Sequence, residues 1–201
     1  MNYELRIRKQ NNAGYTLIET MIAVALFTII VVMGMSALLN ANLLYNKSKN
    51  MRSIMDSLSY TMDDMSRNLR TGYGYYCITG SGPVAPPYTP TNGATCSGIE
   101  FTPSGGGSPW AYEVATTDGV NYFIQKAVYN GTTWPWVQMT PTEVSISSSV
   151  NAFSVFGAPL ASSGDTLQPF VNIRLSGQIK YQNITSPFSL QTSVSQRQID
   201  I

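Results

Sequence analysis

One apolar run near the amino terminus constrains the fold of this chain more than any other feature. Residues 21–39 are 19 consecutive positions without a charged side chain, and a helix of about 20 apolar residues can cross a bilayer. Glu19 lies two positions before this run. A carboxylate inside the hydrocarbon costs about 2.5–3.5 kcal/mol on insertion scales, so Glu19 is a functional candidate that needs a charged partner. The alternative is a plain single-pass anchor with a chance glutamate at its edge.

The segment before the apolar run is short and polar. It carries Arg6, Arg8 and Lys9 against Glu4, and positive charge beside a membrane span keeps that end in the cytoplasm. A secretory signal peptide has its apolar stretch before the cleavage site. Here the apolar stretch follows Gly14, so cleavage after Gly14 would leave the membrane helix on the mature protein.

The sequence Gly14-Tyr15-Thr16-Leu17-Ile18-Glu19 resembles the cleavage motif of the type IV prepilins, with tyrosine where that family usually has phenylalanine. The resemblance implies that a prepilin peptidase cuts between Gly14 and Tyr15 and methylates the new amine. It also implies that Glu19 pairs with the amino terminus of a neighbouring subunit during assembly. Opposite charges attract strongly at low dielectric and each is costly alone, so such a pair would fix the axial register of the subunits. Gly14 as an ordinary loop glycine is the alternative.

Helical periodicity continues beyond the apolar run. Apolar residues recur at steps of 3, 1, 3, 4, 3 and 4 on one helical face, at Met51, Ile54, Met55, Leu58, Met62, Met65 and Leu69. We predict one helix over residues 16–70, about 80 Å long at 1.5 Å per residue, with Thr71-Gly72 as its end. The position of a proline found in many major pilins is Ser36 here, so Gly34 and Ser36 are the points where this helix could weaken.

From Gly98 onward the pattern is typical of strands. Aromatic and branched residues at 110–114 and 120–124 flank an Asp118-Gly119 turn, which predicts a hairpin. A second hairpin is predicted from the similar segments 127–129 and 134–137, which flank Asn130-Gly131. Pro135 would place the last of these strands at an edge or a bulge. Shorter candidates lie at 143–147 and 152–156. Apolar residues alternate on odd positions over 171–181 and on even positions over 188–194, with a turn over 182–187.

These patterns predict an α+β fold class: a long N-terminal helix, transmembrane and then amphipathic, packed against an antiparallel β-sheet head, with a pilin-like layout. The predicted organisation has five parts. They are a prepilin leader peptide at 1–14, a transmembrane and filament-core helix at 15–40, the amphipathic half of the same helix at 41–71, a disulfide-closed loop at 72–97 and the β-sheet head at 98–201.

The two cysteines, Cys77 and Cys96, both follow the membrane span. In an oxidising compartment we expect them to form one disulfide. The loop between them is rich in glycine and proline and has little predicted regular structure, so the cross-link would stabilise the head by about 3 kcal/mol in the chain-entropy model. A metal site is the weaker alternative, because two cysteines 19 positions apart lack further ligands.

Composition excludes several function classes. The chain has no histidine, so Ser-His-Asp and Cys-His catalysis and His-ligated metal sites are excluded. Beyond residue 72 there are six acids and four bases, and no basic field is available for nucleic acid. A carboxylate-only or Ser-Lys enzyme stays open, but no motif suggests one. We therefore predict no catalytic site and no cofactor. We also predict no metal site, because Asp165, the one candidate ligand for calcium, alone gives too few oxygen ligands.

Aromatic residues are the remaining candidates for binding. The first group could form a sugar- or surface-binding face, or its rings could be ordinary core and sheet packing. It consists of Trp110, Tyr112, Tyr122, Tyr129, Trp134 and Trp136. Tyr73, Tyr75 and Tyr76 lie beside Cys77 and could be an adhesive patch or pack under the disulfide loop. We expect packing for both groups.

The resemblance therefore implies a minor pilin or pseudopilin, a structural subunit of a type IV pilus or a type II secretion pseudopilus. Its implied partners are other pilin or pseudopilin subunits, the prepilin peptidase, the inner-membrane assembly platform, and membrane lipid before assembly. The precursor would be a single-pass cytoplasmic (inner) membrane protein with its head outside the cytoplasm, and then part of a periplasmic or cell-surface filament. The alternatives are a filament-tip adhesin or uptake subunit binding carbohydrate, surfaces or DNA, and an anchored enzyme.

Overall fold

The computed structural model describes residues 14–80, 82–147, 152–159, 164, 167–181 and 184–197. The chain divides into two compact units, Met1–Lys47 and Ser48–Ile201. Helix α1, Leu17–Thr71, contributes residues to both units. The single helix predicted over 16–70 is therefore confirmed, with each end within one residue of the prediction.

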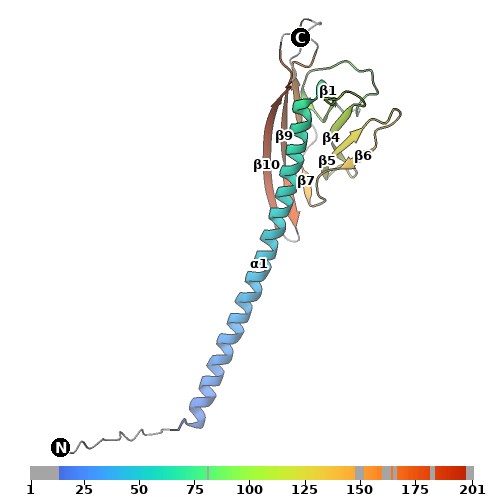
Figure 1. Ribbon diagram of the computed structural model, residues 1–201. Helices are drawn as coiled ribbons and strands as arrows, with labels where there is room; N and C mark the ends of the chain where they lie inside the picture. Colours follow the sequence, from blue (N-terminus) through green and yellow to red (C-terminus); the bar gives the residue numbers. More distant parts are fainter. Residues whose placement is uncertain are drawn as a thin grey trace, which may run out of the picture. The chain divides into compact units, whose positions relative to one another are not determined.

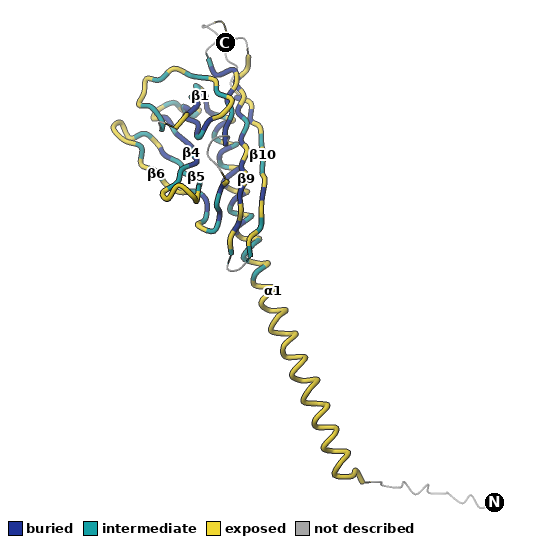
Figure 2. The backbone as a smooth tube through the Cα atoms, turned by 180° about the vertical axis from the view of Figure 1, so that it is seen from behind, coloured by how far each residue is buried: buried dark blue, intermediate teal, exposed yellow. Residues whose placement is uncertain are grey.

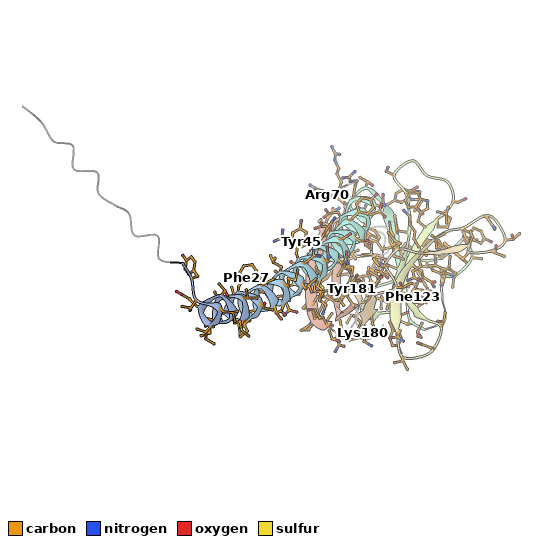
Figure 3. All side chains as sticks on the ribbon, turned by 90° about the horizontal axis from the view of Figure 1, so that it is seen from below. Phe27, Tyr45, Arg70, Phe123, Lys180 and Tyr181 are labelled. Carbon is orange, nitrogen blue, oxygen red and sulfur yellow. A yellow bond between two sulfur atoms is a disulfide. The ribbon has the colours of Figure 1, made fainter. Side chains whose placement is uncertain are left out.

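In the first unit, α1 is unbroken and its side chains are exposed. The most apolar window of the helix has a mean hydropathy of 2.6 with none of it buried, so α1 can cross a membrane by length and composition. Phe27 and Tyr45 project from it without cover (Figure 3). Two hydroxyls in this unit, those of Thr28 and Ser36, donate to the carbonyls four residues earlier. These bonds satisfy the hydroxyls within the helix, as an apolar environment requires.

In the second unit, one face of α1 is buried in the core of the head. The buried apolar residues of the helix are Ile54, Leu58, Met62, Met65 and Leu69. They belong to the predicted stripe, and Met51 and Met55 are partly buried against the same core. The helix ends at Thr71, where the Gly72 N–H donates to the Asn68 carbonyl at 2.9 Å. A Cβ on Gly72 would lie 2.4 Å from a ring carbon of Phe101, so only glycine allows this close approach.

The head is a ten-stranded antiparallel sheet within the described residues. Its strand order is β1-β3-β4-β5-β7-β9-β8-β2, with β6 beside β5 and β10 beside β9 (Figure 1). The strands are β1 (Tyr73–Ile78), β2 (Gly93–Cys96), β3 (Gly98–Thr102), β4 (Trp110–Thr116), β5 (Tyr122–Val128), β6 (Trp136–Gln138), β7 (Val144–Ile146), β8 (Phe153–Phe156), β9 (Phe170–Tyr181) and β10 (Ile184–Ser195). The α+β layout with an antiparallel head is thus confirmed.

The prediction that strands begin at Gly98 was wrong, because β1 and β2 lie inside the segment predicted as a loop. The pairing of β1 with β3 is irregular between Tyr73 and Tyr76, and Gly74 has a positive φ of 66°. This irregularity interrupts the period-2 pattern from which a strand is recognised. The loop prediction describes only the middle of the segment, residues 79–92, where the described residues form an isolated bridge between Thr91 and Tyr76.

The other strand predictions are close to the structure. The two predicted strands at 120–124 and 127–129 are replaced by the single strand β5, which covers only Tyr122–Val128 and pairs with β4 across the Asp118-Gly119 turn. Strand β6 starts directly after Pro135, and β5 is its one partner strand within the described residues. The predicted turn over 182–187 is too long, because β10 begins at Ile184 and includes Pro187. Residues 182 and 183 lie outside the described part of the chain.

The alternation predicted for the last two strands is confirmed. Val171, Ile173, Leu175 and Ile179 of β9 are buried, as are Phe188 and Val194 of β10. The buried residues of both strands face the core that contains α1 (Figure 2). The opposite faces of both strands are exposed, which gives a sheet with one dry and one solvated side.

Candidate processing and assembly site

Gly14 and Tyr15 precede α1 and are open to solvent. Tyr15 is 82% exposed, and a Cβ on Gly14 would meet nothing within 4 Å. The peptide bond between them is therefore accessible to a peptidase. Residues 1–13 of the predicted leader lie outside the described residues.

Thr16 forms the amino-terminal cap of α1. Its hydroxyl accepts the Glu19 N–H at 3.4 Å, and its carbonyl accepts the Thr20 N–H at 3.2 Å. Thr16 and Glu19 have the spacing of a capping box, in which the first side chain satisfies the free N–H of the third helical residue. The sequence that resembles a cleavage motif is thus also the start signal of the helix.

Glu19 is exposed in the first turn of α1. A carboxylate is favoured there because the free N–H groups of a helix start carry partial positive charge. Among the described residues Glu19 has no ion-pair partner within its own chain. The arrangement leaves this carboxylate free to bind a cation supplied by another molecule.

The comparisons with known proteins agree with this geometry. Residues 9–35 match the family model described as the prokaryotic N-terminal methylation motif. The chain carries the type IV prepilin-type signal. This signal contains Gly14, Tyr15 and Glu19 and extends into the apolar half of α1. No curated protein and no solved structure matches the chain.

The prepilin-type signal has consequences for the class of protein. It supports a precursor of the pilin or pseudopilin kind and suggests a structural subunit rather than an enzyme. It implies assembly with other pilin subunits. Together with the apolar helix it fits a membrane-anchored precursor.

The predicted disulfide is present in the head. Cys77 of β1 is bonded to Cys96 at the end of β2, with their Cα atoms 5.4 Å apart. A Cβ on Gly93 would lie 2.1 Å from the Cys77 sulfur, so this glycine makes room for the cross-link. Among the described residues no cluster of three or more His, Cys, Asp or Glu could hold a metal. Asp165, the calcium candidate, lies outside the described residues.

Tyr112 of the predicted aromatic face is buried and links the sheet to α1. Its hydroxyl donates to the Asp64 carboxylate at 2.9 Å and accepts from the Asn68 amide at 2.8 Å. Burial raises the pKa of this phenol far above its usual value. Lys126 completes the group, 3.4 Å from Asp64 and 4.1 Å from the centre of the Trp110 ring. Tyr112 and Trp110 therefore have the packing role expected of them.

Tyr129, Trp134 and Trp136 form a row of rings on the β5–β6 hairpin. The ring centres of Tyr129 and Trp134 are 5.2 Å apart, and those of Trp134 and Trp136 are 6.4 Å apart. All three side chains are only half-buried. This ring row is the part of the predicted aromatic face that the fold leaves available for contact.

The tyrosines beside Cys77 mostly pack. Tyr75 is fully buried and its hydroxyl donates to the Leu69 carbonyl at 2.5 Å, and burial raises its pKa well above its usual value. Tyr76 packs edge-on against Tyr88 of the disulfide loop, with ring centres 5.8 Å apart. Tyr73 is 37% exposed, whereas Tyr75 is fully buried. The three tyrosines therefore do not form one exposed adhesive patch.

Glu100 is a buried acid, which was not predicted from the sequence. Its side chain is fully buried in β3, where one carboxylate oxygen accepts the Val84 N–H at 3.1 Å. The other oxygen has no partner among the described residues. Burial raises the pKa of Glu100 to about 7. The signal in the sequence is a lone acid between the apolar residues Ile99 and Phe101, and in the structure residues 98–101 of β3 are all buried.

Proposed function

We propose that this protein is a minor pilin or pseudopilin, cleaved after Gly14 and assembled through α1 into a type IV pilus or a type II secretion pseudopilus. One observation carries the proposal: the prepilin-type signal is joined directly to an uninterrupted and fully exposed apolar helix. A soluble protein does not leave such a surface uncovered. Lipid would cover it in the precursor, and neighbouring helices would cover it in a filament.

Glu19 would select the assembled state over the lone subunit. In the bilayer its carboxylate is costly without a partner, and the methylated amine of Tyr15 on a neighbouring subunit would supply the opposite charge. The pair would form only when two helices align, so it couples extraction from the membrane to correct axial register.

The proposal that this protein is a pilin or pseudopilin also implies a location and partners for the precursor. The basic residues before Gly14 would hold the amino end in the cytoplasm and place the head outside it. The prepilin peptidase and the inner-membrane assembly platform would act on it there. The sparsely charged head and the serine at position 36 support a minor rather than a major subunit. The protein would have no catalytic role.

The test is the intact mass and amino-terminal sequence of the protein from cells with and without an active prepilin peptidase. We expect a chain starting at methylated Tyr15 in the first case and at Met1 in the second. Gly14→Val should block the cut, because a branched side chain would crowd the accessible bond. Gly34→Ala is the matched control and should be cut normally, since a Cβ at Gly34 meets nothing. An uncut chain in both strains would contradict the proposal.

The ring row of Tyr129, Trp134 and Trp136 favours a second function, binding of carbohydrate at a filament tip. Aromatic faces on an exposed hairpin can stack against apolar faces of sugars, and two of these side chains are tryptophans. The test is retention of the protein on a glycan array, with Trp136→Ala expected to abolish binding. Tyr60→Ala is the control, because Tyr60 is 72% exposed on α1 and forms no ring pair with another described residue. Equal retention of both variants would contradict this function.

A further inference from the structure

Strand β10 has one unpaired edge. It pairs with β9 over its whole length, from Ile184 opposite Tyr181 to Ser195 opposite Phe170. Within the described part of the chain no strand pairs with its other edge. β10 is the outermost strand on its side of the head in Figures 1 and 2. An edge of this kind presents free backbone donors and acceptors to a second chain.

The register shows which residues of β10 point their backbone groups outward. Pro187 lies opposite Gln178 and has no N–H to donate to β9. Its backbone nitrogen therefore faces the outer side of the strand, away from β9. Backbone direction alternates along a strand. Gln196, of opposite parity, donates its N–H to the Pro169 carbonyl beside β9, and Arg197 donates outward to the Arg70 carbonyl. The outward-pointing positions are therefore the odd ones. Among the described residues nothing accepts from the N–H groups of these odd positions, which are Thr185, Ser189, Gln191, Ser193 and Ser195.

The usual protection of a sheet edge is nearly absent here. Exposed edges are commonly blocked by lysine, proline or a bulge. β10 contains no charged residue, and its pairing with β9 has no register shift. Pro187 blocks one position near the start of the strand. The edge from Ser189 to Ser195 is left open to pairing.

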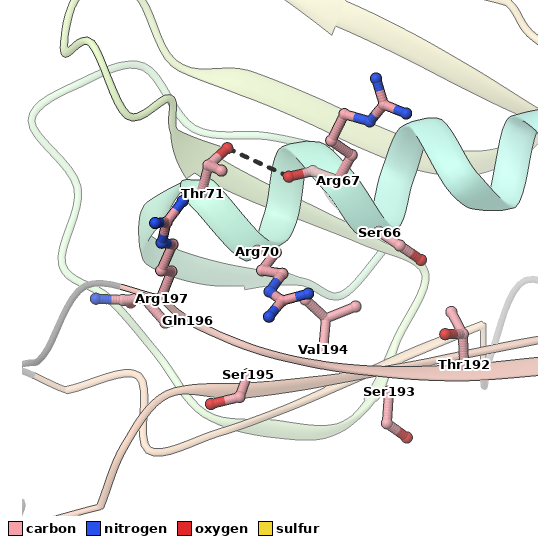
Figure 4. Close-up of a pocket in the computed structure, with 10 residues that line it drawn as sticks. All are labelled: Ser66, Arg67, Arg70, Thr71, Thr192, Ser193, Val194, Ser195, Gln196 and Arg197. Carbon is pink, nitrogen blue, oxygen red and sulfur yellow. Dashed lines mark hydrogen bonds between the residues drawn. The ribbon is translucent and has the colours of Figure 1, made fainter.

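A groove lined by basic residues lies beside the open part of this edge. It has a volume of about 940 Å³ and is lined by Ser66, Arg67, Arg70 and Thr71 of α1 and by residues 192–197. Consecutive residues of β10, of both parities, line it, so the groove lies along the edge of the strand and not over one of its faces. Arg70 and Arg197 reach into the space between the helix end and β10, whereas Arg67 points away from it (Figure 4).

Arg67, Arg70 and Arg197 form no ion pair with another described residue. The ion pair found among the described residues joins Lys126 and Asp64. The negative end of the α1 dipole stabilises cations at this place, but it leaves their guanidinium groups available. Arginine binds carboxylates through two parallel hydrogen bonds. A second copy of β10 could pair with the edge but has no acid to offer the groove.

We propose that β10 accepts an extended acidic peptide segment of another protein as an added strand. The backbone of that segment pairs with the outward groups of Ser189 to Ser195, and its carboxylates bind Arg70 and Arg197. Backbone pairing supplies affinity and the groove supplies specificity for acids. This binding is separate from assembly through α1 and does not depend on cleavage after Gly14.

The test uses the full chain in detergent micelles and two labelled octapeptides, one alternating glutamate with valine and one alternating lysine with valine. We expect the glutamate peptide to bind at least tenfold more tightly than the lysine peptide. Ser193→Pro removes one outward N–H and should weaken binding about tenfold. Thr185→Pro is the matched control, because it removes an outward N–H outside the open stretch. Arg70→Gln with Arg197→Gln should remove the preference for glutamate.

A modified peptide keeps the test decisive even where a proline variant fails to fold. The glutamate peptide methylated on alternate backbone nitrogens cannot add as a strand, and we expect it not to bind. Equal binding of the methylated peptide would overturn strand addition, and equal binding of the lysine peptide would overturn the role of the groove. Self-association through β10, lost in Ser193→Pro without any peptide, would assign the edge to a second copy and overturn the proposal.

Discussion

At the scale of a single residue, the backbone and the carboxylate of Glu19 can be changed independently. Its backbone N–H is capped by Thr16 and belongs to the start of the helix. Its carboxylate is exposed and has no ion-pair partner among the described residues. A substitution that keeps the backbone and removes the charge therefore tests assembly without preventing helix formation.

We predict that Glu19→Gln is inserted and cleaved normally but enters filaments at least tenfold less than the wild type. Insertion does not need the charge, whereas pairing with a neighbouring amine does. The measurement is the ratio of filament-bound to membrane-bound protein by immunoblot. Glu143→Gln, a half-buried acid of the head, is the control and should be incorporated normally. Normal incorporation of the Glu19 variant would remove the pairing role.

Glu100 makes the stability of the head depend on pH. Its pKa is about 7 in the folded protein against 4.5 in an unfolded chain, because burial disfavours the charged form. The folded state thus binds more protons than the unfolded state between these values. Its stabilising contribution is fully present below about pH 4.5 and is lost as pH rises through about 7.

We predict that Glu100→Gln reduces this loss. The difference in unfolding free energy between variant and wild type should shift in favour of the variant by up to about 3 kcal/mol between pH 4.5 and pH 8. The amide keeps an oxygen for the Val84 N–H, and the cost of its buried NH₂ is the same at both pH values. Urea unfolding at both pH values gives the difference, and a constant difference would show that Glu100 does not titrate in this range.

At the scale of elements, the disulfide joins two strands that the sheet itself does not pair directly. Cys77 is in β1, which pairs with β3, and Cys96 is in β2, which pairs with β8. The described residues of the intervening segment 79–92 have little regular structure to hold these strands together. The cross-link therefore acts mainly by limiting the unfolded chain.

We predict that Cys77→Ser combined with Cys96→Ser lowers the unfolding free energy of the head by about 2–4 kcal/mol. Membrane insertion through α1 should be unaffected, because the span lies in the other unit. Thermal unfolding with and without reductant provides the control: reductant should destabilise the wild type and leave the double variant unchanged. A wild type indifferent to reductant would show that the cross-link contributes no stability.

At the scale of the whole molecule, the two compact units differ in what they need. The unit Ser48–Ile201 contains the buried core residues, including its own segment of α1. The described residues of the unit Met1–Lys47 bury no apolar side chain, so we expect lipid or other chains to cover them.

We predict that residues 48–201 produced alone are soluble and melt at the same temperature as the head of the full chain. The full chain should need detergent or membrane, because its apolar helix stays exposed in water. Circular dichroism of both forms, with sedimentation to test for aggregates, provides the measurement. A truncated head that does not fold would show that the first unit contributes to the core.

The sequence by itself determined the features that depend on local order along the chain. Periodicity gave the helix with its buried stripe and the β9–β10 alternation, because a side chain's face follows from its position in a regular element. The signal around Gly14, Tyr15 and Glu19 is likewise linear, because it is a motif of consecutive residues. The Cys77–Cys96 pair followed from there being two cysteines.

Only the tertiary structure decided the features that depend on which segments meet. β1 was missed because its irregular pairing with β3 hides its pattern, and Glu100 is buried because strands and the disulfide loop close around it. The open edge of β10 and its groove arise where the end of α1 comes beside residues 192–197. No local pattern encodes the meeting of these two segments, because the residues that line the groove from α1 and from β10 are more than 120 positions apart in the sequence.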